Sequence, residues 1–412
     1  MRKDDRNADE MSTIRRMTRI ETMAVHGGRD DLTDLGVHAP PIDLSTTYPM
    51  ADQLKAGEAL QDWAEGAAHA KSPVYARLHN PTVARFEQAL AQLEATDAAV
   101  AFGSGMAAVT AVLQASCVMR GKPHVVAVRP LYGGTDHLLS SGLLGVTTTY
   151  TTQDEVAREI RPDTGLVVIE TPANPNLDLI DIAHVVAQAG DVPVMVDNTF
   201  ATPILQNPAA FGATYVLHSG TKYLGGHGDV LGGVVACAES LAGPLRQVRI
   251  LTGAVLHPLG GYLLHRGLAT LPLRVEAAQR TAKLLVERLG NHDAVEFVRY
   301  PKPDGLQLRG SGAMIAFATR ADPFDVVRRL KLITPAVSLG SVDTLIEHPA
   351  ALTHRLVPGQ AREASGVPAN LLRVSIGLEH FDDIWHDLNR ALCDAAYVKA
   401  SPSDYWAMTA AH

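Results

Sequence analysis

The chain of 412 residues has little of several features that define other classes of protein. It has three cysteines, Cys117, Cys237 and Cys393, which are far apart in the sequence and odd in number. A disulfide framework needs paired cysteines, so this pattern favours a reducing, cytoplasmic location. Uninterrupted apolar runs are short as well, and none approaches the roughly 20 residues that a membrane-spanning helix requires.

Basic residues are too few and too scattered for nucleic acid to be the main partner. Lys and Arg number 36 against 44 Asp and Glu, a net charge of −8, and the short pair Arg15-Arg16 is the densest basic cluster. Residues 1–17 are charged throughout and lack the apolar core of a secretion signal, so we expect a disordered tail there. The 46% hydrophobic content fits a folded globular chain, long enough for two domains.

Residues 18–78 are rich in turn residues and show weak periodicity. Structureless segments of this length are uncommon in compact domains and usually have a function, so we interpret this one as an N-terminal arm. After it, Asn80 or Thr82 can cap a helix whose apolar residues repeat from Val83 to Leu93.

Beyond the arm, short apolar runs alternate with helical patterns. Strands are predicted at residues 98–102, 124–128, 166–170, 192–196, 215–218 and 230–236, and helices at 105–119 and 182–189. This alternation predicts an α/β fold with a mostly parallel sheet that helices cover on both faces. A long amphipathic helix over residues 273–289 leads into a smaller set of elements, including 312–319 and 370–376. We therefore expect a large domain over residues 79–272 and a C-terminal domain over 273–412.

One lysine follows the apolar run that ends at residue 218, in Ser219-Gly220-Thr221-Lys222-Tyr223. A lysine amine that attacks an aldehyde must be partly neutral, which burial and nearby positive charge both favour. Ser219 and Thr221 offer hydroxyl groups for an anion. An exposed loop lysine is the commoner case, and this motif alone does not separate the two.

A second anion-binding pattern is Gly103-Ser104-Gly105-Met106, which opens the helix predicted at residues 105–119. Free backbone N–H groups at a helix N-terminus bind anions, although Gly-Ser-Gly is also an ordinary turn. Arg77 can add a bidentate guanidinium. Neither this run nor the one around Lys222 matches a Walker P-loop.

Asp197 ends an apolar strand, where a carboxylate is costly to bury without a cationic partner. A protonated pyridine nitrogen would be such a partner, and this pairing strengthens pyridoxal phosphate (PLP) as an electron sink. The alternative is an aspartate that caps the next turn. Both interpretations stay open at this point.

Three further residues follow or lie within apolar runs. Tyr132 precedes two glycines, so its ring can lie flat against a planar group, or it is a core tyrosine. Asn174 lies in a turn fixed by prolines. Arg373 lies inside an apolar strand, where either a bound carboxylate or an internal salt bridge would satisfy it.

Taken together, the order and spacing of these motifs resemble the Cys/Met-metabolism family of PLP enzymes, from about Thr22 to Leu388. The resemblance implies the PLP-dependent transferase fold type I, which is aspartate-aminotransferase-like, with a seven-stranded sheet domain and a smaller C-terminal α/β domain. It also implies a homotetramer, a dimer of dimers with shared active sites. The motifs that carry it are Tyr75-x-Arg77 with Asn80-Pro81-Thr82, Glu170-Thr171-Pro172-Ala173-Asn174-Pro175, Asp197-Asn198-Thr199, Ser219-Gly220-Thr221-Lys222-Tyr223 and Ser338-Leu339-Gly340.

By this resemblance, PLP is the cofactor, Lys222 binds its aldehyde covalently, Asp197 pairs with the ring nitrogen and Tyr132 stacks on the ring. Lys222 then moves protons, while Tyr132, its pKa lowered by nearby cations, protonates the departing thiolate. Arg373 and Ser338 receive the substrate α-carboxylate. The remaining residues implied at the cofactor are Gly105, Met106, Asn174, Thr199, Ser219 and Thr221, with Tyr75 and Arg77 from the neighbouring subunit. The resemblance also implies that Tyr75 is a catalytic residue.

Members of this family differ in their chemistry at the substrate γ-carbon. Cystathionine lyases and synthases commonly carry glutamates where Val74 and Val337 stand, and these suit a distal ammonium. Two valines make the distal pocket apolar, which suits an S-methyl group. We therefore expect a carbon–sulfur lyase that performs α,γ-elimination on methionine, releasing methanethiol, 2-oxobutanoate and ammonia. Cystathionine γ-lyase, cystathionine γ-synthase and a non-enzymatic PLP-binding regulator are the alternatives. Gly134 departs from the methionine-lyase pattern, which usually has cysteine there.

Overall fold

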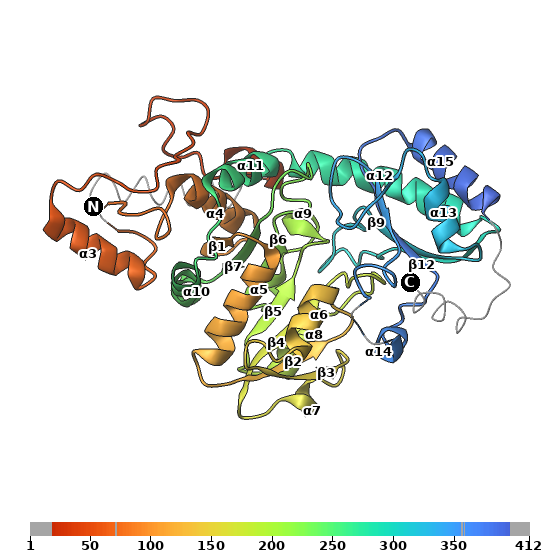
Figure 1. Ribbon diagram of the computed structural model, residues 1–412, viewed down its shortest axis with the longest axis horizontal. Helices are drawn as coiled ribbons and strands as arrows, with labels where there is room; N and C mark the ends of the chain where they lie inside the picture. Colours follow the sequence, from red (N-terminus) through yellow and green to blue (C-terminus); the bar gives the residue numbers. More distant parts are fainter. Residues whose placement is uncertain (1–18, 71, 356, 358, 396–412) are drawn as a thin grey trace.

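The computed structural model describes residues 19–395 except residues 71, 356 and 358. The disordered tail expected over residues 1–17 lies outside the described residues. Two sheets with their helices form the body of the molecule, and the N-terminal arm extends from one side of it (Figure 1). Among the described residues, no helix is long and apolar enough to cross a membrane.

The larger sheet has seven strands in the order β1-β7-β6-β5-β4-β2-β3. β7 runs antiparallel to both of its neighbours, and the other pairs are parallel. This confirms the predicted α/β class and the mostly parallel seven-stranded sheet. The strands are β1 (Ala98–Phe102), β2 (His124–Val128), β3 (Thr147–Thr151), β4 (Thr164–Glu170), β5 (Val194–Asp197), β6 (Tyr215–Ser219) and β7 (Gly233–Cys237).

Apolar residues that alternate along the strands bury both faces of this sheet. In β1, Ala99 and Ala101 belong to one core cluster, while Val100 and Phe102 belong to another on the opposite face. The helices and helical turns of this part are α4 (Pro81–Leu93), α5 (Gly105–Leu113), the π-helical η1 (Gln114–Val118), α6 (Gly133–Ser140), α7 (Val156–Glu159), α8 (Ile182–Ala189), α9 (Thr202–Leu205), η2 (Pro208–Phe211), α10 (Glu239–Thr252) and α11 (Pro258–Leu268).

The expected helix cap before residue 83 is made by Asn80. Its side-chain oxygen accepts hydrogen bonds from the backbone N–H groups of Thr82 (3.0 Å) and Val83 (3.2 Å). Thr82 uses its hydroxyl differently, accepting from the N–H of Asp43 at 2.8 Å. This second bond ties the arm to the start of α4.

The long helix α12 (Leu271–Gly290) leads from the first sheet to a five-stranded sheet of order β10-β11-β12-β9-β8. β12 runs antiparallel to β11 and β9, and its register places Arg373 opposite Glu347 and Ala316. The strands are β8 (Val295–Arg299), β9 (Met314–Thr319), β10 (Thr334–Pro335), β11 (Leu345–Glu347) and β12 (Leu371–Ser375), with helices α13 (Pro323–Arg329), α14 (Gly359–Ala364) and α15 (Phe381–Asp394).

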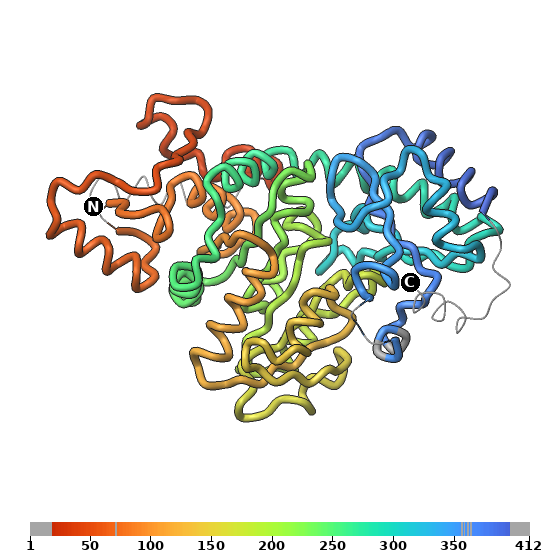
Figure 2. The backbone as a smooth tube through the Cα atoms, in the orientation of Figure 1, coloured from red at the N-terminus to blue at the C-terminus, as the bar shows by residue number. Residues whose placement is uncertain are grey.

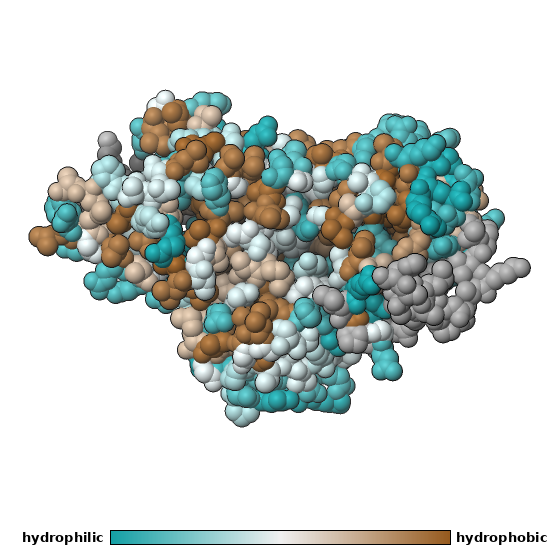
Figure 3. All heavy atoms as spheres, in the orientation of Figure 1, coloured by the Kyte–Doolittle hydropathy of each residue, from teal (hydrophilic) through white to brown (hydrophobic). Residues whose placement is uncertain are grey.

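The arm contains two helices, α2 (Ile20–His26) and α3 (Gln53–Ala64), and the tube in Figure 2 shows α3 lying at the edge of the molecule. Large apolar side chains are unusually exposed along the arm, and apolar atoms are visible on it at the left of Figure 3. The residues are Leu35, Val37, Ile42, Leu44, Met50, Leu54 and Leu60.

Candidate active site

The carboxyl ends of neighbouring strands place polar side chains around one cavity of about 230 Å³. β4 ends at Glu170, β5 at Asp197 and β6 at Ser219, and these strands are adjacent and parallel. Ligands of open α/β sheets bind beyond this edge. The predicted residues that line the cavity are Gly105, Met106, Tyr132, Asn174, Asp197, Thr199, Ser219, Thr221, Lys222, Val337, Ser338 and Arg373.

Lys222 lies three residues beyond the end of β6, and its side chain reaches the segment that carries Ser338. Its Nζ donates a hydrogen bond to Oγ of Ser338 at 2.6 Å. Burial and then the positive charge of Arg373 lower the pKa of Lys222, Glu347 opposes them, and the result is a pKa of about 8. Near neutral pH, a larger fraction of this amine is therefore neutral than of an ordinary lysine, as a nucleophile or base requires.

Asp197 closes β5 at the floor of the cavity. Its Oδ1 accepts hydrogen bonds from the backbone N–H of Thr199 at 3.0 Å and from the Thr199 hydroxyl at 2.5 Å. Both bonds reach the same oxygen, which leaves Oδ2 for another partner. Burial raises the pKa of Asp197, and the Thr199 bonds and the charge of His218 oppose that rise. A cationic group at Oδ2 would offset the cost of burial.

The N-terminus of α5 lines another side of the cavity with polar groups. Ser104 caps the helix by accepting from the N–H of Ala107 at 3.1 Å, and Gly105 and Met106 begin the first turn. A methyl group added to Gly105 would lie 3.2 Å from Cβ of Ser219, so glycine keeps this gap open. Backbone N–H groups, the helix dipole and the Ser219 hydroxyl together suit a phosphate.

Tyr132 caps the N-terminus of α6, and its backbone N–H donates to Oε2 of Glu170 at 2.7 Å. Burial raises the pKa of Tyr132, Glu347 and Glu170 raise it further, and Arg373 only partly opposes them. The expectation that nearby cations lower this pKa was wrong for the protein alone, because burial and the three carboxylates of Glu347, Glu170 and Asp197 outweigh one guanidinium. A Cβ at Gly134 would lie 2.6 Å from Cε1 of Tyr132, so glycine accommodates this ring position.

Arg373 reaches the cavity from β12 with a side chain that is 2% exposed. Its NH2 lies 3.1 Å from Oε1 of Glu347 and donates to the carbonyl of Ser338 at 3.1 Å, and NH1 donates to Oδ1 of Asn174 at 2.6 Å. An internal salt bridge therefore does accompany this buried arginine. The guanidinium also lines the cavity, where a carboxylate can reach it.

Two buried carboxylates of the site had no role assigned from the sequence. Glu170 accepts from the N–H groups of Tyr132 and Asn174, and burial raises its pKa well above the ordinary value. Glu347 pairs with Arg373 and accepts from the Thr353 hydroxyl at 2.7 Å. Glu170 ends an apolar strand as Asp197 does, so the same signal could have found it. The pairing of Glu347 depends on strand register and has no local signal.

Three predicted residues lie away from the cavity that Lys222 lines. Arg77 donates to the carbonyl of Ile250 at 2.7 Å, and its guanidinium lies 5.7 Å from the ring centroid of Tyr75. Val74 is buried against Trp63 and Ile250. Tyr75 is 44% exposed and Arg77 is exposed as well, whereas Val74 is buried.

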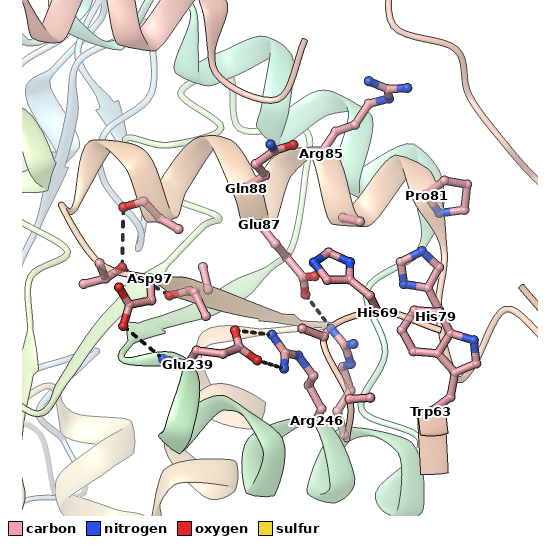
Figure 4. A pocket seen from close by; sticks show the side chains of 18 of the residues that line it. Trp63, His69, His79, Pro81, Arg85, Glu87, Gln88, Asp97, Glu239 and Arg246 are labelled. Carbon is pink, nitrogen blue, oxygen red and sulfur yellow. Dashed lines mark hydrogen bonds and ion pairs between the residues drawn. The ribbon is translucent and has the colours of Figure 1, made fainter. Parts of the chain in front are cut away.

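A larger cavity of about 760 Å³ lies between the arm and the first domain (Figure 4). Trp63 and His79 stack there with ring centroids 4.3 Å apart, and Glu239 pairs with Arg246 on α10. Arg85 also pairs with Asp31 there and Arg249 with Glu87, and none of the lining residues is a predicted catalytic residue. Nor is there, within the described residues, a group of three His, Cys, Asp or Glu side chains that could hold a metal ion.

Comparisons with known proteins agree with this geometry. The model of the family described as Cys/Met metabolism PLP-dependent enzyme matches residues 21–393. An L-methionine gamma-lyase of Streptomyces avermitilis is 56% identical over 374 residues, which cover 90% of this chain and 89% of that protein. A cystathionine gamma-lyase of Bacillus subtilis is 38% identical, covering 90% and 98%. Among solved structures, the cystathionine gamma-lyase CalE6 of Micromonospora echinospora superimposes with a TM-score of 0.82 at 37% identity, covering 92% and 100%.

Proposed function

The chain belongs to the Cys/Met metabolism family of PLP-dependent enzymes, and from that premise we propose that it is a methionine γ-lyase. It would convert methionine and water into methanethiol, 2-oxobutanoate and ammonia. The observation that carries the proposal is that one cavity holds Lys222, Asp197 and Arg373, with the apolar Val337 in place of a carboxylate. Three relatives with 54–56% identity are L-methionine gamma-lyases.

The residues of the cavity fit PLP. The gap kept open by Gly105 beside Ser219 suits the phosphate, and Oδ2 of Asp197 suits a protonated ring nitrogen. When bound, PLP supplies an electron sink that makes the substrate Cα acidic. Lys222 is then placed to carry protons to and from the substrate carbons, because its pKa of about 8 lets the amine both accept and release a proton.

Substrate binding and leaving-group protonation would be performed by side chains on either side of Lys222. Arg373 would bind the α-carboxylate through its guanidinium, with Ser338 next to it. Because burial raises the pKa of Tyr132, its hydroxyl keeps its proton at neutral pH. It can therefore give that proton to the departing sulfur.

Cystathionine γ-lyase is the second candidate, because a relative of that name is 38% identical. The purified protein should be given methionine and cystathionine separately. We expect methanethiol and 2-oxobutanoate from methionine at the higher kcat/KM. Faster release of cysteine from cystathionine would instead support the second candidate, and no turnover of either would favour a PLP-binding regulator.

The choice between these substrates rests on Val337, because Val74 is only 6% exposed and has little surface to offer a ligand. We expect Val337→Glu to lower kcat/KM for methionine by about 10- to 100-fold, because a carboxylate opposes an S-methyl group. It should also raise kcat/KM for cystathionine. Val337→Gln, which adds similar bulk without charge, is the matched control. Equal effects of Glu and Gln on both substrates would contradict the charge argument.

We also propose that two chains share each active site, as part of a homotetramer with a small-molecule amino-acid substrate. The arm exposes a row of large apolar side chains, and Tyr75 and Arg77 lie away from the chain's own Lys222. The cavity of about 760 Å³ under the arm is a place for a second copy to enter.

We further propose that the protein works in a reducing cytoplasm, because its three cysteines are free.

Mixing two inactive variants tests this sharing. If Arg77 serves the neighbour's Lys222, a mixture of Lys222→Ala and Arg77→Ala subunits forms dimers with one intact site. Random 1:1 exchange should restore activity to roughly one quarter of the native level, since half of the dimers are mixed and half of their sites are intact. Activity that stays at the level of the separate variants after subunit exchange would show that each site is built from one chain.

A further inference from the structure

The backbone on both sides of Tyr132 contacts Thr353 and His354, two residues of the segment that follows β11. On one side, the carbonyl oxygen of Leu131 lies 3.3 Å from Nε2 of His354. On the other side, a Cβ added to Gly133 would collide with the carbonyl oxygen of Thr353. Only a glycine permits this close approach of two backbones. One short segment therefore holds both neighbours of the tyrosine.

The ring of His354 is set up to donate to Leu131. Its residue is only 2% exposed. Burial and then the charge of Arg373 lower the pKa of His354, the hydrogen bond to Leu131 opposes them, and the result is a pKa of about 4. At pH 7 the ring is therefore neutral and has a single N–H. That proton belongs on Nε2, because a carbonyl oxygen can only accept.

Three further side chains hold Thr353 and His354 in place. The Thr353 hydroxyl lies 3.1 Å from Nδ1 of His354 and 2.7 Å from Oε1 of Glu347, so both of its possible acceptors are buried neighbours. Glu347 is in turn paired with Arg373 at 3.1 Å. NH1 of the buried Arg362 donates to the carbonyl of His354 at 3.1 Å. Such a network keeps the segment in one position.

The direction of the Tyr132 side chain depends on its backbone more than on packing. The residue is 39% exposed, so few neighbours restrict the ring. Its backbone N–H is held by Oε2 of Glu170 at 2.7 Å, and the contacts of Thr353 and His354 hold the peptide groups before and after it. A proton donor has to lie within hydrogen-bond reach of the atom that it protonates.

We propose that Thr353 and His354 are positioning residues for Tyr132: they fix its backbone so that the hydroxyl is aimed at the departing sulfur. This inference rests on the proposed function, because it takes Tyr132 as the proton donor of the elimination. The described residues that line the cavity include Thr353 and Tyr132 but not His354, so His354 acts through the tyrosine.

His354→Leu tests the proposal, because leucine fills the space but cannot donate to the Leu131 carbonyl. The purified holoenzyme is given methionine and, separately, its S-trifluoromethyl analogue, and 2-oxobutanoate is measured with both. The fluorines make the departing thiolate a weak base that leaves without a proton. We expect kcat for methionine to fall about 10- to 100-fold, the cost of misplacing a catalytic group. For the analogue, which needs no general acid, kcat should change by less than about threefold.

Two matched variants serve as controls. His354→Gln keeps an N–H that can donate to Leu131, so kcat for methionine should stay within about threefold of the native value. Leu352→Ala changes the same segment at a half-exposed side chain outside the cavity and should leave the ratio of the two kcat values unchanged. If His354→Leu does not fold, Gly133→Ala replaces it, because the added methyl group would push the Thr353 carbonyl away.

The two substrates separate positioning from a merely structural role. An equal loss of kcat with methionine and with the analogue would overturn the proposal, and so would a native kcat for methionine in His354→Leu. A native protein that turns over neither substrate would instead refute the proposed function.

Discussion

Replacing Lys222 with alanine should lower kcat by at least about 10⁴-fold, the scale seen when a group that is both nucleophile and general base is removed. The structure places this amine in a cavity where burial and Arg373 bring its pKa to about 8. Alanine removes both the covalent attachment of PLP and the proton carrier. Among the described residues that line the cavity, Lys222 is the only lysine, so no second amine is in place to replace it.

Absorption and rescue measurements check this expectation. The native protein should absorb in the visible range, lose that band on treatment with borohydride and retain PLP on denaturation afterwards. Lys222→Ala should show none of this fixation but should keep its Tm in the absence of cofactor, since Lys222 makes one side-chain hydrogen bond, to Ser338. Added methylamine should restore part of the activity. Full turnover by Lys222→Ala without added amine would refute the assigned role.

The sequence was enough to predict the class of fold because apolar runs alternate with helical patterns from residue 98 onwards. β3 (Thr147–Thr151) was absent from that list of strands. Its sequence is Thr-Thr-Thr-Tyr-Thr, and it lies at the sheet edge, where its residues are exposed or half-buried. An edge strand needs no apolar face on both sides, so hydrophobicity gives no signal for it.

The position of Asp197 was predictable because a charged residue directly after an apolar strand is costly unless something pairs with it. Glu170 gives the same signal, yet its role in holding the Tyr132 and Asn174 backbones emerges only from the turn geometry. The pairing of Arg373 with Glu347 needed the register of β11 against β12. Long-range pairings of this kind depend on the packed fold rather than on local spacing.

The pKa of Tyr132 shows why charge patterns in a sequence are a poor guide to titration. Of the cations expected near Tyr132, only Arg373 lowers its pKa, and the Arg373 guanidinium is itself paired with Glu347. Desolvation then decides the direction of the shift, because a phenolate loses more solvation than the phenol. The consequence is chemical: the raised pKa makes Tyr132 a proton donor at neutral pH rather than a base.

Asp197→Asn should lower kcat by about 10²–10³-fold, the usual effect of removing one preorganised electrostatic partner. Asparagine has the same shape and can still accept from Thr199 through Oδ1. Its amide cannot hold a positive charge on the ring nitrogen, so the substrate Cα would become less acidic. KM should change much less than kcat, because Arg373 and Ser338 would still bind the α-carboxylate.

Although Asp197→Asn should lower kcat, it should not lower the thermal stability of the cofactor-free protein. Burial raises the folded-state pKa of Asp197, so the folded protein holds this proton more tightly than the unfolded chain does. An aspartate of this kind reduces stability progressively as the pH rises from its unfolded pKa through its raised folded pKa. Apo Asp197→Asn should therefore have a Tm at pH 7 equal to or above that of the native apoprotein. Adding PLP should reverse the order.

Thermal unfolding at pH 7 with and without saturating PLP measures both halves of this expectation. Asp178→Asn is the control, because burial also raises the pKa of Asp178 while its carboxylate bonds to Asn176 outside the cavity. Its Tm should respond to PLP as the native protein does. If Asp197→Asn lowered Tm equally in both forms, Asp197 would be a structural carboxylate that caps the Thr199 turn. A decrease in Tm of Asp197→Asn that occurs only with PLP bound would show that Asp197 acts on the cofactor, where its destabilising buried charge has a function.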